Sequence, residues 1–341
     1  MNAKREVLGA WGDDNRQTSK LKKLIRPLLV VMALCGCYNF SDIVYINVGH
    51  KKNVKTVLSA TFRMVYLLIM FVVCIKYGVA IHYVSSEYKL FAVECFLVNI
   101  SIVTFFVACF KMTNRRYGNL EKSFKTWEDD IVPEFMAMEL RCQDSMIEAR
   151  TKLVVIAAFV ITVINVAAVA VLVEIYPELA WIHLFPLPYT TWTNIGFILL
   201  IFMICTVFIV TQAYTVVLSR TLTILFKILS EKLEQDICSN GSKIPPNFQR
   251  LRLLHLKLTK LVVELDKDLG WFYAANFGYG TGLGVFTLYQ ITKITMDTHL
   301  LIVVVVWLLS SLAVIGIAAT FAALLHDAVS LIRRKHIDIS V

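Results

Sequence analysis

The sequence predicts an all-α fold, a polytopic transmembrane helical bundle, and three observations lead to this prediction. The 341-residue chain is 57% hydrophobic and only 17% charged, whereas soluble proteins are about 25% charged. Its apolar residues come in blocks of about 20 rather than alternating with polar residues at a helical or strand period. The first 23 residues are hydrophilic and show no signal-peptide pattern. Because a backbone in lipid must satisfy its hydrogen bonds within its own segment, each block is expected to be helical.

Six blocks are long enough to span a bilayer, and one is too short. One span lies between Val57 and Val84, and the others are Glu94–Phe110, Leu153–Leu172, Ile195–Val217, Trp271–Gln290 and Leu300–Leu325. The short block, Ile25–Phe40, carries Pro27 and Gly36 and falls below the roughly 20 residues that a span needs. We expect it to form a re-entrant or interfacial helix.

The distribution of basic residues predicts the orientation. With six spans and the N-terminus in the cytoplasm, all of the 34 Lys and Arg except Lys76, Lys89 and Lys293 fall on the cytoplasmic side. This agrees with the positive-inside rule and predicts a multi-pass protein of the plasma membrane. The net charge of +9 is then explained by anionic lipid headgroups as partners, and no nucleic-acid partner is expected.

We expect a cytoplasmic tail over 1–24, a transmembrane domain over 25–335 and a short tail over 336–341, with cytoplasmic helical extensions at about 112–150 and 220–268. The second extension contains a leucine ridge in which leucines recur at spacings of three and four, as in a heptad. The ridge must pack against something, and two alternatives are equally open: a hairpin within the chain, or a subunit contact with another copy. The ridge consists of Leu251, Leu254, Leu258, Leu261 and Leu265.

No motif in the sequence indicates an enzyme, a metal site or a cofactor site. The glycines at 278, 280, 282 and 284 lie within a predicted span, where they allow close helix packing or a bend. A transporter would be expected to carry ionisable residues near the centres of its spans. Glu94 and Asp268 are instead predicted at span ends, accessible to water, so the pattern favours sensing over transport.

Aromatic and small polar residues gather in the predicted outer half of the membrane. The loop between Ile175 and Trp192 is rich in aromatic residues and contains no Lys or Arg. Either an interfacial aromatic belt or a ligand pocket would have this composition. If a ligand binds there, the residues that we expect to contact it are Asn165, Trp192, Asn194, Tyr289, Gln290 and Trp307.

Several segments, in order along nearly the whole chain, resemble those of the insect gustatory receptor family. Arg26–Phe40 resembles the family's N-terminal segment, Leu218–Leu233 the end of its fourth helix, and Leu253–Gly270, followed by Phe286–Tyr289, its fifth helix. The family is part of the seven-helix insect chemoreceptor superfamily, which also contains the odorant receptors. The resemblance implies a subunit of a homo- or hetero-tetrameric, ligand-gated, non-selective cation channel that detects a small-molecule tastant. It also implies a cytoplasmic N-terminus, ligand binding in the outer half of each subunit and subunit contacts through the cytoplasmic helices.

The chain departs from the family pattern at its end. The family's seventh helix lines the pore and carries a TYxxxxxQF-like motif, whereas Ala322–Lys335 aligns better with the inner end of the sixth helix. Only seven residues follow Arg334, so we expect the seventh helix to be missing and the receptor to be truncated and deficient in its pore. The alternative to a chemoreceptor is a membrane transporter or a non-channel membrane scaffold.

Overall fold

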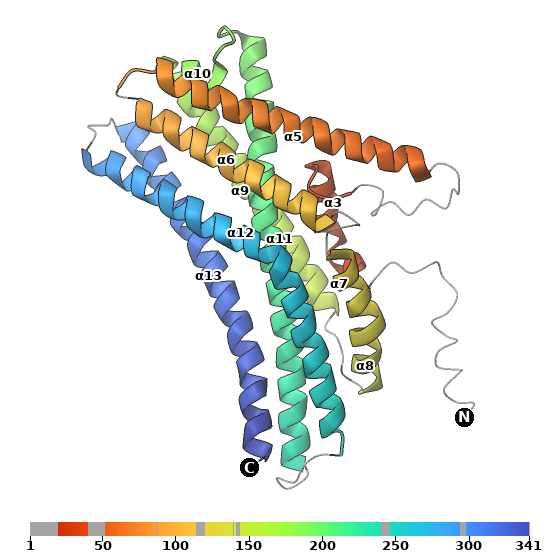
Figure 1. The fold of residues 1–341 in the computed structure, drawn as a ribbon. Coiled ribbons are helices and arrows are strands. Elements are labelled where there is room, and N and C mark those ends of the chain that lie inside the picture. Colours follow the sequence, from red (N-terminus) through yellow and green to blue (C-terminus); the bar gives the residue numbers. More distant parts are fainter. Residues whose placement is uncertain are drawn as a thin grey trace.

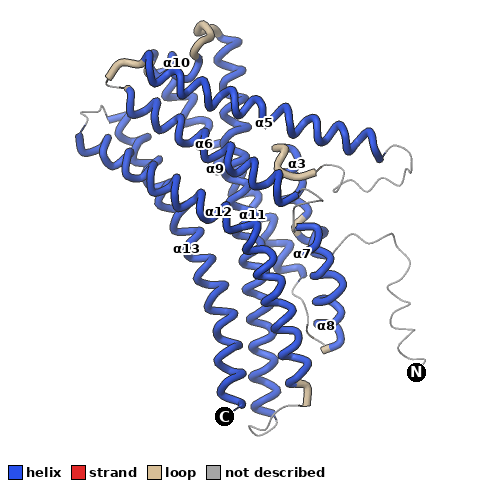
Figure 2. The backbone as a smooth tube through the Cα atoms, viewed as in Figure 1, coloured by secondary structure: helices blue, strands red, loops and turns tan. Residues whose placement is uncertain are grey.

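The computed structural model describes residues 20–39, 52–86, 88–113, 120–138, 140, 144–239, 246–293 and 298–340. All regular structure in these ranges is helical, which confirms the predicted fold class (Figures 1 and 2). The elements are α2 (Lys20–Leu24), α3 (Arg26–Leu34), α5 (Lys52–Tyr83), α6 (Lys89–Thr113), α7 (Leu120–Thr126), the π-helix η1 (Trp127–Ile131), α8 (Val132–Ala137), α9 (Asp144–Ile175), α10 (Pro177–Leu184), α11 (Thr191–Ser239), α12 (Phe248–Lys293) and α13 (Thr298–Ser340).

Five of these helices are long and apolar enough to cross a membrane. The candidate spans are Val57–Tyr83, Lys89–Thr113, Ser145–Ile175, Thr191–Ser239 and Thr298–Ser330. They contain five of the six predicted spans, and the chain is therefore a multi-pass membrane protein. The sixth predicted span, Trp271–Gln290, lies in α12, which packs between α6 and α13. Its four glycines make it less apolar than the other spans.

Helix α3 confirms that the short N-terminal block does not span the membrane. Its nine residues extend over about 14 Å, less than half of a hydrocarbon core of roughly 30 Å. The chain turns immediately after it, at Gly36, whose φ of 74° lies in the left-handed region. A β-carbon at Gly36 would also lie 3.1 Å from the ring of Phe106. The helix packs against α9 and α11, and Phe40 of the predicted segment lies outside the described residues.

Helices α11 and α12 run on well past the apolar spans, as predicted. Their 49 and 46 residues correspond to lengths of about 74 Å and 69 Å. In Figure 1 they lie side by side with α13 at the lower end of the molecule.

The leucine ridge is buried within the single chain, which is one of the two alternatives that the sequence left open. Each of the five leucines is at most 4% exposed within the single chain. They belong to one apolar cluster with Leu222, Leu225, Leu229 and Leu233 of α11. Of the two alternatives, the structure therefore shows the hairpin within the chain, because the paired helices bury the leucines against each other.

The described residues of the predicted extension at 112–150 are mostly helical, and those from Leu120 to Ala137 are divided into α7, η1 and α8. The π-turn at Trp127–Ile131 comes directly before Pro133. Proline lacks the N–H that an unbroken α-helix would use at this position, which accounts for the break. Trp127 and Ile131 still face inward and are buried.

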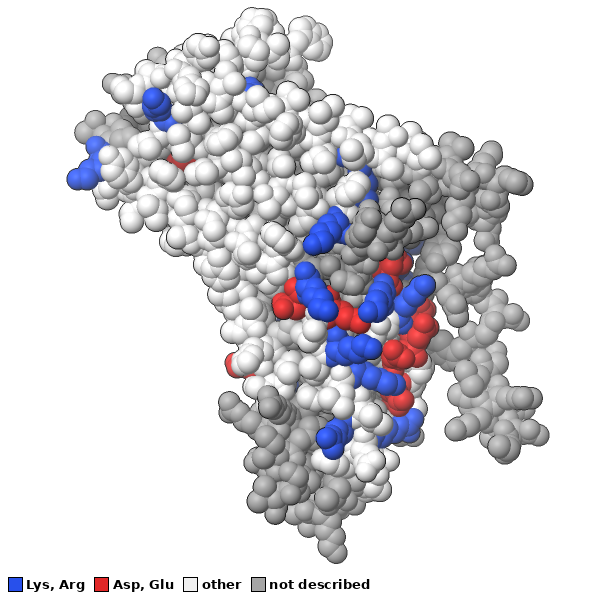
Figure 3. Space-filling view, viewed as in Figure 1, with Lys and Arg blue, Asp and Glu red and all other residues white. Residues whose placement is uncertain are grey.

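Charged side chains gather at one end of the molecule, as Figure 3 shows for the face in view. We call this the charged end and define it as α7, η1, α8, the part of α11 after Arg220 and the part of α12 before Lys267. Ion pairs link its helices: Lys122 lies 2.8 Å from Glu264, and Arg250 and Lys257 lie 3.1 Å and 3.4 Å from Glu134. Burial alone would raise the pKa of Glu134, but Arg250 and Lys257 outweigh it and hold that pKa below its usual range. The opposite end, formed by α10, residues 84–86 and the loop at 185–190, is called the α10 end.

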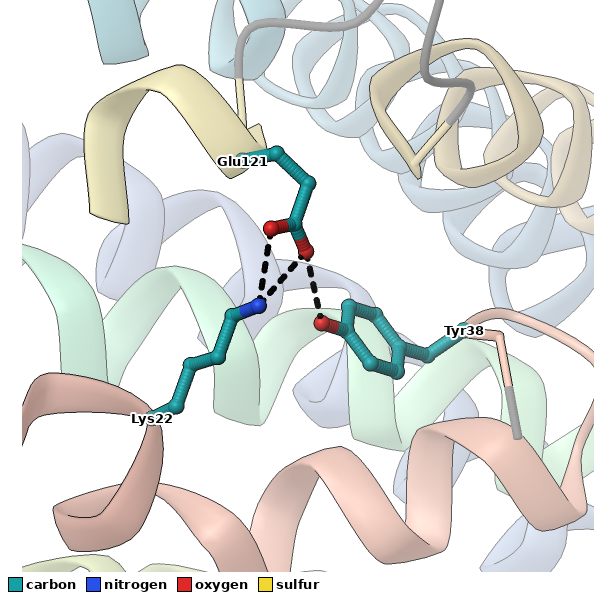
Figure 4. Close-up of polar contacts among 3 residues, drawn as sticks. All are labelled: Lys22, Tyr38 and Glu121. Atoms are coloured by element: carbon teal, nitrogen blue, oxygen red, sulfur yellow. Dashed lines mark hydrogen bonds and ion pairs between the residues drawn. The ribbon is translucent and has the colours of Figure 1, made fainter. Parts of the chain in front are cut away.

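A three-residue contact attaches the N-terminal helices to α7 (Figure 4). The ammonium of Lys22 lies 2.8 Å from both carboxylate oxygens of Glu121, and the hydroxyl of Tyr38 donates to the same carboxylate at 3.2 Å. The side chains of Lys22 and Glu121 are only 14% and 33% exposed. Partial burial strengthens this pair relative to an ion pair on the open surface.

We expect Glu121→Ala to lower the free energy of unfolding by roughly 1 kcal/mol, because it removes the carboxylate from a half-buried ammonium. Tyr38→Phe should cost less, since the ion pair remains. Asp129→Ala is the matched control, because Asp129 is an exposed carboxylate on the adjoining helix. Thermal melting of the purified protein in detergent measures the effect, and equal melting temperatures for the Glu121 and Asp129 variants would contradict it.

Of the glycines in α12, Gly280 lies at a close approach between helices. A β-carbon there would lie 2.7 Å from Cγ1 of Ile315 in α13, whereas β-carbons at Gly278 and Gly282 would meet nothing within 4 Å. The missing side chain at Gly280 therefore lets α12 and α13 approach closely.

Gly280→Ala should destabilise the packing of α12 on α13 by about 1–3 kcal/mol, which is typical of overpacking. Gly282→Ala should be neutral or slightly stabilising, because the same methyl group enters open space and alanine favours the helix. Melting temperatures of the two variants in detergent test this difference. Equal destabilisation by both substitutions would show that helix geometry, rather than the contact with Ile315, requires the glycine.

Candidate functional site

A buried polar cluster lies at the α10 end, where α5, α10 and α11 meet. The ammonium of Lys76 in α5 donates a hydrogen bond to the backbone carbonyl of His183 in α10. The neighbouring hydroxyl of Tyr77 lies 2.8 Å from Nδ1 of the same histidine. The rings of Tyr77 and Phe197 lie 4.5 Å and 5.9 Å from the ammonium, within the range of cation–π attraction. We call Lys76, Tyr77 and His183 the Lys76–His183 cluster.

Aromatic rings enclose the imidazole of His183. The ring centroids of Phe197, Phe91 and Tyr77 lie 4.9 Å, 5.6 Å and 5.8 Å from that of His183. Trp307 of α13 stacks on Phe91 at 5.4 Å. His183 is only 4% exposed, and its Nε2 atom has no hydrogen-bond partner among the described residues.

The local sequence accounts for the position of His183. Helix α10 begins with Pro177, whose fixed φ suits a first turn, and it lasts only eight residues. Leu179, Ile182 and Leu184 are all buried, so α10 is held against the bundle by its apolar side chains. The packing of α10 therefore holds His183 beside Lys76.

A second buried polar group lies on the adjoining turn of α6. The carboxyl oxygen Oε1 of Glu94 accepts a hydrogen bond from the hydroxyl of Thr287 at 3.3 Å, and the side chain of Gln290 lies nearby. The other carboxyl oxygen, Oε2, is buried and has no hydrogen-bond partner among the described residues. The prediction that Glu94 lies at a water-accessible span end was wrong, since the residue is only 1% exposed. Helix α6 begins at Lys89, so Glu94 lies more than one turn inside the helix and faces α12.

The structure brings two of the six predicted ligand-binding residues to this region. Gln290 contacts Glu94, and Trp307 stacks on Phe91. Of the other four, Trp192 and Tyr289 are 82% and 51% exposed, and the amide of Asn165 donates to the carbonyl of Ile161 in its own helix. Asn194 is half-buried, three residues before Phe197 in α11, and its side-chain oxygen has no hydrogen-bond partner among the described residues. Ligand binding by these residues stays a prediction.

The sequence analysis did not select the Lys76–His183 cluster. A signal was present in Lys76, which lies seven residues before the end of α5 at Tyr83. A lysine so far inside an apolar span is unusual and indicates a specific partner. The partner could not be identified, because His183 is more than 100 residues away and contributes a backbone carbonyl.

The described residues contain no group of three or more His, Cys, Asp or Glu side chains placed to hold a metal ion. The Lys76–His183 cluster instead offers one cation and one unpartnered imidazole nitrogen among aromatic rings. Such an arrangement is suited to bind a small organic molecule by a few polar contacts and an apolar surface.

No protein-family profile matches the sequence, and no curated protein matches it. Among solved structures, the insect olfactory receptor OR5 from Machilis hrabei is similar, with a TM-score of 0.67 over 91% of this chain and 82% of that one. This chain has the fold of an insect olfactory receptor. The sequence identity is only 15%, so the likeness concerns the fold. At that level it agrees with the chemoreceptor superfamily that the sequence resembles.

Tyr77→Phe should lower the free energy of unfolding by about 1–3 kcal/mol, because it leaves both ring nitrogens of the buried His183 without a partner. Tyr83→Phe is the matched control: Tyr83 lies on the same helix but is 69% exposed. Unfolding in detergent, followed by the fluorescence of tryptophan, measures the difference. If both variants unfold at the same temperature as the native protein, the hydrogen bond to His183 contributes nothing to stability.

Proposed function

We propose that the protein is a chemosensory receptor of the gustatory type, a subunit of a ligand-gated, non-selective cation channel that detects a small tastant at the plasma membrane. The observation that carries the proposal is the fold shared with an insect olfactory receptor over 91% of the chain. The segments that resemble gustatory receptors support the finer assignment.

The distribution of charge supports a cytoplasmic N-terminus in this proposal. Almost all Lys and Arg residues lie on the side of the charged end under the predicted topology, and basic residues remain in the cytoplasm during insertion. The charged end would then be cytoplasmic and the α10 end would face outward. A tastant arriving from outside would reach the Lys76–His183 cluster first.

Subunit contacts of the proposed homo- or hetero-tetramer need a surface other than the leucine ridge. The opposite face of α12 offers one at the charged end, outside the apolar spans. Leu253, Leu256 and Val263 are 59%, 53% and 51% exposed and recur at spacings of three and seven. Neither lipid tails nor the rest of the described chain covers these side chains, so a neighbouring subunit is the occupant that we propose.

The test is voltage-clamp recording and calcium imaging of cells that express the chain, alone and together with a related receptor, during a screen of sugars, bitter compounds, organic acids and carbon dioxide. We expect a ligand-evoked current, carried by both sodium and potassium, in the cells that also express the related receptor, because that receptor supplies the pore-lining helices in which this chain is predicted to be deficient. Surface labelling confirms that the protein reaches the plasma membrane, and cells without the chain serve as the control.

The two alternatives predict other results. Uptake of a labelled tastant without an evoked cation current would favour a transporter. The absence of both current and uptake, with the protein present at the surface, would favour a non-channel scaffold. Either result would overturn the proposal of a ligand-gated channel.

A further inference from the structure

Lys76 is a mostly buried cation, and no carboxylate of the described residues forms an ion pair with it. No ion pair joins it to another described residue, and the acceptor of its hydrogen bond is the backbone carbonyl of His183. The carboxyl group of Glu94 forms no ion pair with Lys76 and accepts its hydrogen bond from the hydroxyl of Thr287 instead. Removing an ammonium from water costs several kcal/mol, and a neutral carbonyl with aromatic faces offsets only part of that cost. The position is therefore complementary to an anion.

The imidazole of His183 provides a second, independent polar group. Its Nε2 atom has no partner among the described residues although the side chain is 96% buried, being 4% exposed. When the hydroxyl of Tyr77 donates to Nδ1, Nε2 carries the ring proton and is a donor. A donor and a cation on neighbouring elements can both bind the oxygens of one carboxylate.

The surroundings limit the rest of the ligand to apolar groups. Phe91 and Phe197 flank the imidazole, and Trp307 extends this aromatic surface towards α13. An inorganic anion would leave these rings unused, whereas an aliphatic or aromatic acid would place its hydrocarbon part against them.

We propose that the Lys76–His183 cluster binds organic acids, with the carboxylate held by the Lys76 ammonium and the His183 Nε2–H and the hydrocarbon part held against Phe91, Phe197 and Trp307. The inference rests on the proposed function, since it specifies the ligand class of a receptor site. It assigns recognition to Lys76 and His183, and the predicted residue Trp307 reaches this cluster through Phe91, on which it stacks.

The experiment measures binding to the purified chain in lipid nanodiscs at neutral pH, where the acids are ionised. The probes are straight-chain acids from butanoate to decanoate and benzoate, each compared with its methyl ester and its primary alcohol. Quenching of tryptophan fluorescence reports binding, because Trp181 lies on the same short helix as His183 and Trp307 stacks on Phe91. At least one acid should bind about tenfold or more tighter than its own ester and alcohol.

Lys76→Met should remove this preference, reducing the affinity for the acid about tenfold or more while leaving the affinity for the ester unchanged. Lys76→Arg should restore part of it, because a cation returns to the same place. Lys89→Met is the matched control: Lys89 is an exposed lysine at the same end of the neighbouring helix, so it tests for attraction of acids to the surface alone.

Three results would overturn the inference. The first is that no acid binds more tightly than its ester, a comparison that needs only the native protein and so does not depend on the folding of a variant. The second is that Lys76→Met keeps the preference for the acid. The third is that Lys89→Met loses it equally. These results are distinguishable from a failure of the proposed function. Acid binding without a current would refute only the channel, whereas a current evoked equally by acid and ester would refute only the acid site.

Discussion

The packing of the other helices against α11 is the constraint on which the rest of the fold depends. Helices α3, α6, α9, α10, α12 and α13 all contact it, and its buried residues run from Phe197 to Leu233. The forces differ along its length. In lipid there is no hydrophobic drive to bring helices together, and α11 uses the paired amides of Gln212 and Asn276, joined by hydrogen bonds of 2.6 Å and 3.0 Å. Beyond the membrane, burial of leucines away from water holds the same helix to α12.

The helical class, five of the spans and the non-spanning N-terminal block could be predicted because they follow from composition and length alone. The partner of the leucine ridge could not be predicted, because a heptad pattern shows which residues share a face and not what covers it. The break before Pro133 depends on a proline within a helical pattern. A proline predicts that the helix is interrupted, but it does not predict that the interruption takes the form of a π-turn, as it does here.

The candidate site shows a second reason why sequence reasoning fails. Tyr289 and Gln290 are adjacent, yet one is 51% exposed and the other 3%, because successive residues point roughly 100° apart around a helix. The sequence analysis predicted both as ligand-binding residues from the composition of the region, but they point in different directions around α12. Trp192 and Trp307 differ in the same way: Trp192 is 82% exposed, whereas Trp307 stacks on Phe91. An interfacial aromatic residue and one in a ligand pocket would have the same sequence signature.

The contrast between two buried cations in α5 distinguishes a structural role from a binding role. Arg63 donates to the carbonyl of Gly36 at 2.9 Å and to the hydroxyl of Thr113 at 2.6 Å, and its guanidinium lies 4.6 Å from the ring of Phe110. Its planar group is thus used to hold the N-terminal turn against α5 and α6. Lys76, four turns further along, has rotatable donors and a single carbonyl acceptor. At the charged end, buried or half-buried ionic groups are matched by opposite charges. At the opposite end, no carboxylate of the described residues pairs with Lys76, which is costly for stability alone, and the organic acid that we propose as ligand would supply the missing charge.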